Sequence, residues 1–135
     1  MYMVDSNIWV YYFDENLPEH SMVVKYLDPL IKQENISTST IILVEVIHYL
    51  FKRLGPVIGY EKSHVFQLGH FETLEFTSKD LDEFLDMFQK VSHHGIGGRD
   101  VTILVCMKKA GISKLVTHDQ DFKKIKGIEV IDPTE

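Results

Sequence analysis

The sequence contains only one cysteine, Cys106, in 135 residues. A single cysteine excludes an internal disulfide and a cysteine zinc site, and its place in an apolar stretch indicates that it is buried as a small hydrophobic side chain.

No apolar run approaches the ~20 residues that a membrane span needs, and the opening MYMVDSNIW lacks the basic segment of a secretion signal. We therefore expect a soluble, cytoplasmic protein without a membrane-spanning segment.

Recognisable zinc and phosphate-loop motifs are also missing. Of the seven histidines, His93 and His94 are adjacent and the others are scattered, and no HExxH motif occurs. Ordinary surface or half-buried histidines explain them better than a metal site does. Gly95, Gly97 and Gly98 form a glycine-rich turn, which has neither a GxGxxG pattern nor the lysine and serine of a Walker loop. We interpret it as a turn that lets the next helix start close to the sheet.

Positive charge is scarce in the first two thirds of the chain. The formal net charge of −6 argues against a generally basic nucleic-acid binder. Residues 1–94 hold 14 acidic and 7 basic residues, whereas residues 95–135 hold 6 acidic and 7 basic residues. The late lysines suit either a rim that binds phosphate or an ordinary solvated face, and the sequence leaves both open. These lysines are Lys108, Lys109, Lys114, Lys123, Lys124 and Lys126.

The chain is rich in short apolar runs that alternate with amphipathic segments. With 44% hydrophobic residues it can form a core as one domain, which we place at residues 1–135. Repeated strand, helix, strand order implies right-handed crossovers. The pattern predicts an α/β fold, with a central parallel sheet of about five strands and helices on both faces. Strands are expected at residues 2–4, 37–39, 71–76, 112–117 and 128–131, and helices from about residue 8, at 19–32, 40–53, 61–68, 80–91 and 100–110, and around 122–125.

Several carboxylates stand next to the predicted strand ends. Asp5 follows the first strand, Asp119 and Asp121 follow the strand at 112–117, and Asp100 begins a helix behind the glycine-rich turn. Open parallel sheets bind their ligands at the carboxyl ends of the strands, so these acids can face one crevice. Asp5 also has a simpler explanation as the N-cap of the next helix.

Glu45 lies in the middle of a strongly apolar helical segment, residues 40–53. A carboxylate in such surroundings needs water, a partner or a metal. The alternative is a narrow polar stripe, because Glu45, His48 and Lys52 recur at helical spacing. Periodicity alone does not separate the two interpretations.

Together these residues give a candidate site of Asp5, Glu45, Asp100 and Asp119, with Asp121 as a fifth acid. Carboxylates that converge in one crevice repel each other unless a cation neutralises them. Ligands that are all oxygen favour Mg²⁺ or Mn²⁺ over zinc. Such a metal activates water and stabilises the charge that develops on a phosphodiester during in-line attack.

The pattern resembles the PIN-domain ribonucleases, and among them the VapC-like toxins of prokaryotic toxin–antitoxin pairs, over nearly the whole chain. In VDSN the resemblance implies that Asp5 is a metal ligand supported by Asn7. STSTIILVE gives Glu45 as the acid on a helix after a Ser/Thr-rich strand, and GIGGRD gives Asp100 as the acid behind a glycine-bearing loop. LVTHDQDF corresponds to the closing strand, acid and phenylalanine of the family, and it selects Thr117, Asp119 and Asp121.

The resemblance implies a metal-dependent endoribonuclease that acts on RNA. It assigns Asp5, Glu45, Asp100 and Asp119 to catalysis, with Asp5, Asp100, Asp119 and Asp121 as metal ligands and Asn7 and Thr117 in support. It also implies a homodimer and an antitoxin protein as partner. One alternative is a PIN domain in RNA maturation or decay. Another is a receiver-like module that binds Mg²⁺ without cutting, but receivers carry an acid pair after the first strand, where this chain has Asp5 alone.

Overall fold

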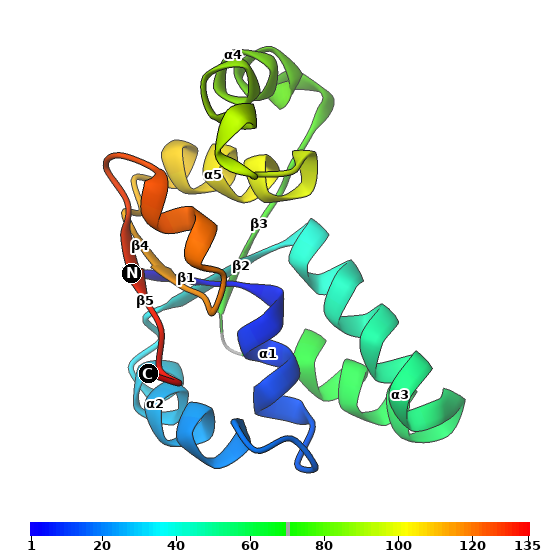
Figure 1. The fold of residues 1–135 in the computed structure, drawn as a ribbon. Coiled ribbons are helices and arrows are strands. Elements are labelled where there is room, and N and C mark those ends of the chain that lie inside the picture. The colour runs from blue at the N-terminus through cyan, green and yellow to red at the C-terminus, as the bar shows by residue number, and fades with distance from the viewer. Residues whose placement is uncertain (70) are drawn as a thin grey trace.

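A computed structural model describes residues 1–69 and 71–135 and contains a sheet of five strands, all parallel (Figure 1). The spatial order is β3-β2-β1-β4-β5. The α/β fold with a five-stranded parallel sheet is therefore confirmed. The strands are β1 (Tyr2–Val4), β2 (Ile36–Ser39), β3 (Glu72–Leu74), β4 (Lys114–Val116) and β5 (Glu129–Ile131).

Helices cover both faces of this sheet. In Figure 1 the first two helices lie on one side, and the fourth and fifth lie together on the other side. This placement follows from the strand order, because the chain moves from β1 outward to β3 and then crosses back to β4 and β5. The helices are α1 (Ser6–Phe13), α2 (His20–Lys32), α3 (Thr40–Gln67), α4 (Leu81–Val91) and α5 (Gly98–Ala110), with short 3-10 helices η1 (Ser78–Asp80), η2 (Ser92–His94) and η3 (Gln120–Lys124).

The strand order reverses between β1 and β4, which are neighbours in the centre of the sheet. Val4 pairs with Val116, so the residues that follow these two strands emerge side by side. A reversal of this kind leaves a crevice at the carboxyl ends of the strands, since the chain leaves the two strands toward opposite faces. The topology thus brings Asp5 and Thr117 together.

Helix α3 consists of two helical segments that meet at Gly55, so the expected break is confirmed, and the second segment begins earlier than expected. We expected it to end at Gly55 and Pro56, with a separate short helix at 61–68. Gly55 has a φ of 83°, which breaks the helical path, but the helix resumes at Pro56 and continues to Gln67. Proline is favourable at the first position of a helix, so Gly55 ends the first segment and Pro56 begins the second. The second part folds back until Gly59 lies against the backbone of Phe51.

The returning part of α3 contributes to the core through an aromatic cluster around Trp9. The Trp9 ring centroid lies 4.9 Å from that of Phe66 and 5.1 Å from that of Phe71, and all three residues are packed into the core. Helix α5 is buried from Asp100 to Met107, including Cys106 as expected. The core therefore fixes α1 and α5, the two helices that start beside the carboxyl ends of the central strands.

No helix in the described part of the chain is long and apolar enough to cross a membrane. The expectation that His70 is an ordinary surface or half-buried histidine lies outside the described residues.

Candidate active site at the carboxyl ends of the central strands

Asp5 joins β1 to α1 and is 2% exposed. Its backbone amide donates to the carbonyl of Val116 at 3.0 Å, which extends the pairing of the two central strands. Its Oδ1 accepts from the amide of Ser6 at 2.7 Å, so Asp5 does cap α1. The other oxygen, Oδ2, accepts from the hydroxyl of Thr117 at 2.7 Å. The cap uses one oxygen of the carboxylate and leaves the second facing the end of β4.

Asn7 and Thr117 hold this carboxylate from two elements. The Asn7 Nδ2 donates to Asp5 Oδ2 and to Thr117 Oγ1, both at 3.3 Å, and its Oδ1 accepts from the amide of His118 at 3.2 Å. Thr117 Oγ1 also accepts from the amide of Asp119 at 3.0 Å. A network in which each polar group has a partner is rigid when buried. It fixes the orientation of Asp5 and the start of the Asp119 loop together.

The two acids after β4 have different surroundings. Asp119 is the N-cap of η3, and its Oδ1 accepts from the amide of Asp121 at 2.9 Å. The side chain of Asp121 is 43% exposed, and its carboxylate lies 3.0 Å from the Nζ of Lys124. Asp119 therefore belongs to the edge of the crevice, whereas Asp121 forms an ion pair on the surface.

Glu45 and Asp100 are joined by Arg99, a residue that the sequence analysis did not select. The Arg99 Nη1 contacts Glu45 Oε1 on α3, and its Nη2 lies 2.9 Å from Asp100 Oδ1 on α5. Nη1 also donates to the hydroxyl of Ser6 at 3.4 Å. Glu45 thus has a cationic partner, and the polar-stripe interpretation does not account for this contact. We refer to Asp5, Glu45, Asp100 and Asp119 below as the acidic site.

The acids influence one another's ionisation. Burial raises the pKa of Asp5, and the charge of Glu45 raises it further, while the hydrogen bonds from Thr117 and Ser6 oppose the rise. Burial also raises the pKa of Asp100, the charge of Arg99 lowers it, and the charges of Asp5 and Asp119 raise it again. Like charges disfavour ionisation only when they are near. The charges of the acidic site are therefore coupled, although its four residues come from separate segments of the chain.

The same acids also change the pKa of Arg99, and they favour its charged form. Burial lowers the pKa of its guanidinium, but the hydrogen bond to Glu45 and the charges of Glu45, Asp100 and Asp5 outweigh that effect and raise it. A cavity of about 370 Å³ lies beside the guanidinium, lined among others by Ser6, Asn7, Glu45 and Arg99. The site is thus open to a ligand on the side where Arg99 lies.

The acids are near each other but do not form a closed metal-ligand cluster. Within the described residues, no three side chains of His, Cys, Asp or Glu are gathered closely enough to hold a metal ion. The available donors of the acidic site are all carboxylate oxygens, which suits the hard cations Mg²⁺ and Mn²⁺. Asp5 and Asp100 are also disfavoured in their ionised form, which a bound cation relieves. The donor chemistry therefore fits such an ion, while Arg99 engages two of the acids.

Sequence reasoning missed Arg99 and Ser6. A signal for Arg99 was available, because it is one of only two arginines in the chain and directly precedes Asp100 in GGRD. Arginine is the usual partner for a carboxylate in a partly buried place. Its contact with Glu45 spans 54 residues of sequence, which no local pattern indicates.

Solved structures share this fold. A chain of VapBC2 from Rickettsia felis, in complex with a DNA fragment from its promoter, aligns with a TM-score of 0.76 and 24% identity over 96% of both chains. VapC20 of Mycobacterium tuberculosis, described as a toxin that cleaves the sarcin–ricin loop, aligns at 0.75 and 18% identity over 91% of this chain and 93% of its own. FitAcB from Neisseria gonorrhoeae aligns at 0.77 and 19% identity over 98% of both.

At these identities the structural matches show a common fold. No curated protein matches the chain in sequence. The family model described as the PIN domain matches residues 2–128, which include every member of the acidic site. The chain therefore belongs to the PIN domain family.

Proposed function

We propose that this protein is a Mg²⁺- or Mn²⁺-dependent endoribonuclease and the toxin of a cytoplasmic toxin–antitoxin pair. The observation that carries the proposal is geometric: Arg99 bridges Glu45 of α3 and Asp100 of α5, beside Asp5, whose carboxylate accepts from Thr117 at the end of β4. The raised pKa of Asp100, caused mainly by burial, agrees with it. Acids that destabilise one another at a switch point of a parallel sheet are suited to hold a cation. Membership of the PIN family and the shared fold with VapBC2 and VapC20 support the same function.

In this proposal each side chain has a defined task. Asp5, Asp100 and Asp119 hold the ion, and Asp121 adds an outer carboxylate at the mouth of the site. Thr117 and Asn7 keep Asp5 Oδ2 turned toward the crevice through their hydrogen bonds. A bound ion supplies a more acidic water and neutralises charge on the phosphodiester.

Glu45 and Arg99 act from the opposite wall of the crevice. We assign to Glu45 the role of accepting a proton from an attacking water; its side chain is 30% exposed and lines the cavity beside Arg99, which supports this role. The side chain of Arg99 is 43% exposed. In this proposal its guanidinium therefore turns from the acids to a phosphate oxygen without having to leave a packed core. The same rotation frees Asp100 and Glu45 for the ion and the water.

The test uses purified protein and a panel of RNAs that includes the sarcin–ricin loop, because VapC20 cleaves that loop. We expect cleavage in Mg²⁺ or Mn²⁺ and none in excess EDTA. Asp119→Asn should reduce the rate about 100-fold or more, as expected when a metal ligand is lost. Asp86→Asn, an exposed acid on α4, serves as the matched control and should retain full activity. Undiminished cleavage in EDTA would refute the metal dependence.

The proposed partner is an antitoxin that inserts a cationic side chain among these acids. Arg99 already makes such contacts within the chain, which supports the idea that the site accepts a guanidinium. Expression in a bacterial host should arrest growth, and Asp119→Asn should relieve the arrest. A homodimer, also proposed, is measured by sedimentation. If the host keeps growing although the purified protein cleaves RNA, a role in RNA maturation or decay replaces the proposed role as a toxin.

A further inference from the structure

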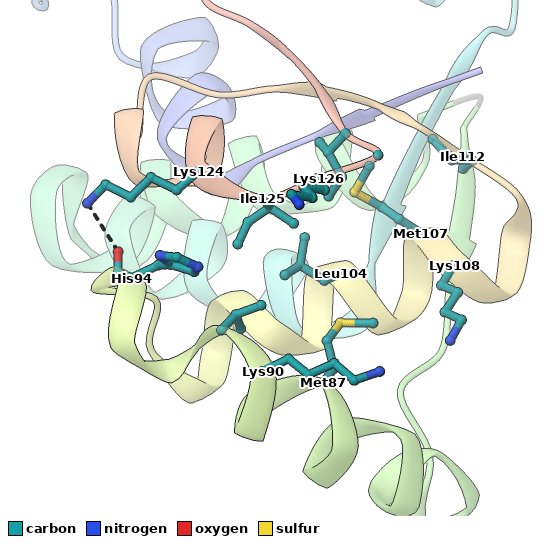
Figure 2. Close-up of a pocket in the computed structure, with 13 residues that line it drawn as sticks. Met87, Lys90, His94, Leu104, Met107, Lys108, Ile112, Lys124, Ile125 and Lys126 are labelled. Carbon is teal, nitrogen blue, oxygen red and sulfur yellow. Dashed lines mark hydrogen bonds between the residues drawn. The ribbon is translucent and has the colours of Figure 1, made fainter.

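A second cavity, of about 560 Å³, shares no residue with the acidic site. Figure 2 shows it between α4, the C-terminal half of α5 and the segment at residues 124–128 that leads into β5. This volume falls in the range of sites that bind small molecules or the anchoring side chains of a partner. We call it the lysine-rimmed cavity.

The floor of this cavity is aliphatic. Leu104 and Met107 of α5 are 3% and 1% exposed and form its base, and Met87 and Ile125 are half-buried on its walls. Among the described residues that line it, His94 has the one aromatic ring, and none is phenylalanine, tyrosine or tryptophan. Proteins that bind single-stranded nucleic acid stack successive bases on several aromatic rings, whereas the base of this cavity, Leu104 and Met107, is aliphatic. Methionine and other flexible aliphatic side chains instead suit the apolar side of a helix.

The rim carries positive charge only. Lys90, Lys108, Lys124 and Lys126 line the cavity, and the described lining residues include no aspartate or glutamate. This cluster stands out in a chain whose formal net charge is −6. In Figure 2 the amino groups of Lys124 and Lys108 lie at opposite ends of the cavity. A ligand with one carboxylate would meet only one of these ends, so the rim matches a ligand with several separated negative charges.

Two of the four lysines are already paired. Lys108 contacts Glu83, and Lys124 lies 3.0 Å from Asp121. Lys90 and Lys126 form no salt bridge within the part of the chain that the structure describes. Both are exposed. These two ammonium groups are therefore available to a ligand without breaking an existing ion pair.

Helix α4, which forms one wall, is incompletely covered. It has apolar residues along one face, yet none of its residues is buried. Met87 and Val91 of α4 line the cavity, whereas Leu81 and Leu85, which are 50% and 64% exposed, lie outside its lining. An amphipathic helix gains most of its stability from burying its apolar face, so α4 retains surface that a partner can cover.

We propose that the lysine-rimmed cavity binds an acidic amphipathic helix of a partner protein. Apolar side chains at helical spacing fill the floor over Leu104 and Met107, and carboxylates on the flanks of the helix face the lysines. The rim charges accelerate association and select against basic partners, while the buried apolar contacts hold the complex. This cavity shares no residue with the acidic site, although its Lys124 pairs with Asp121, and the proposed binding does not depend on nuclease activity.

The test measures binding of a fluorescent helical peptide made of leucine and glutamate, with leucines at i, i+3, i+4 and i+7. Fluorescence anisotropy should show saturable binding to the wild-type protein that weakens as salt is raised. The double variant Lys90→Glu/Lys126→Glu should bind at least about tenfold more weakly. The control Lys25→Glu/Lys32→Glu makes the same charge change at exposed positions on α2 and should bind like wild type. Circular dichroism checks that both variants are folded.

Three results would overturn the proposal. The first is equal affinity of the cavity variant and the wild type, or an equal loss in the α2 control. The second is a cavity variant that no longer binds an RNA oligonucleotide but still binds the peptide. That result would assign the lysine rim to RNA. The third is a wild-type dimer that the cavity variant dissociates, which would assign the cavity to a second copy of this chain.

Discussion

The guanidinium of Arg99 lies 2.9 Å from the carboxylate of Asp100, although the two residues are adjacent on the first turn of α5. Neighbouring residues on a helix point in different directions, so this contact requires the arginine to fold back over the helix start. It does so because Glu45 on α3 holds the other side of the guanidinium. The arginine thus occupies the place among the acids where a divalent cation is proposed to bind.

Competition between Arg99 and the ion gives the first prediction. In Arg99→Gln, Mn²⁺ should bind about fivefold more tightly, because a half-exposed ion pair of about 1 kcal/mol no longer has to be broken. The metal-free variant should also unfold at a lower temperature, since Glu45 and Asp100 lose their cation. Isothermal titration calorimetry and thermal melts in EDTA measure the two effects.

Arg53→Gln is the matched control for this substitution. Arg53 is the other arginine in the chain, and its Nε lies 3.6 Å from Asp14, far along α3 from the acidic site. We expect its removal to leave the affinity for Mn²⁺ unchanged. Weaker Mn²⁺ binding by Arg99→Gln would show that Arg99 supports the ion instead of competing with it.

The second prediction concerns Thr117, whose hydroxyl donates to Asp5 Oδ2 and accepts from the amide of Asp119. Thr117→Val keeps the shape of the side chain and removes these two hydrogen bonds together with the one that Thr117 accepts from Asn7. Leaving buried polar groups without a partner costs about 1–3 kcal/mol, so the free energy of unfolding should fall by that amount. The pKa of Asp5 should rise further, because a hydrogen bond to its charged form is lost.

Urea unfolding and carbon-detected NMR of the Asp5 carboxyl measure these changes. Thr73→Val, at an exposed position in β3, is the control and should change neither quantity. An unchanged pKa of Asp5 in Thr117→Val would mean that Asn7 and Ser6 suffice to hold the carboxylate.

Strand ends were the part of the site that the sequence pattern located best. Asp5 and Thr117 directly follow apolar runs, and parallel strands place their carboxyl ends at one edge, so local pattern and topology together predict that they meet. Their contact is 2.7 Å in the structure. Their roles as metal ligand and support stay predictions.

What local pattern missed depends on contacts between distant segments. The break at Gly55 and Pro56 was expected, but only the packing of Gly59 against Phe51 and of Phe66 against Trp9 shows why the chain folds back and is helical again from Pro56. Arg99 is missed for the same reason, because its orientation is set by a residue on another helix. A single sequence carries no periodic signal for either contact.

The third prediction tests the turn in α3. A Cβ atom added at Gly59 would lie 2.7 Å from the Cα of Phe51, closer than real side-chain atoms approach. Gly59→Ala should therefore lower the free energy of unfolding by about 1–3 kcal/mol, although alanine favours helices over glycine. Gly97→Ala, where an added Cβ meets no atom within 4 Å, is the control for urea unfolding. Equal stability of Gly59→Ala and wild type would mean that the two parts of α3 are packed less closely.

The last prediction links the charge of Asp100 to stability, with no substrate required. Its pKa in the folded protein is raised above the ordinary value of 3.8, mainly by burial. Between the two pKa values the folded state binds more protons than the unfolded state, so stability falls as pH rises through this range. Above the folded pKa, and hence at neutral pH, the full cost of ionising Asp100 is present.

Asp100→Asn removes that cost. Without metal at neutral pH the variant should therefore melt at a higher temperature than wild type, and the difference should vanish below about pH 3.8, the unfolded value. Mn²⁺ should raise the melting temperature of wild type more than that of the variant. A ligand at ~100 times its dissociation constant stabilises the folded protein by about 2.7 kcal/mol, and the variant binds Mn²⁺ less well.

An Asp that served only as a favourable charge on the first turn of α5 predicts a lower melting temperature for the metal-free variant, because its loss would cost ~0.3–1 kcal/mol. Thermal melts in EDTA and in Mn²⁺, with Asp86→Asn as an exposed control, separate the two cases. A lower melting temperature of metal-free Asp100→Asn together with an undiminished gain from Mn²⁺ would remove Asp100 from the acidic site.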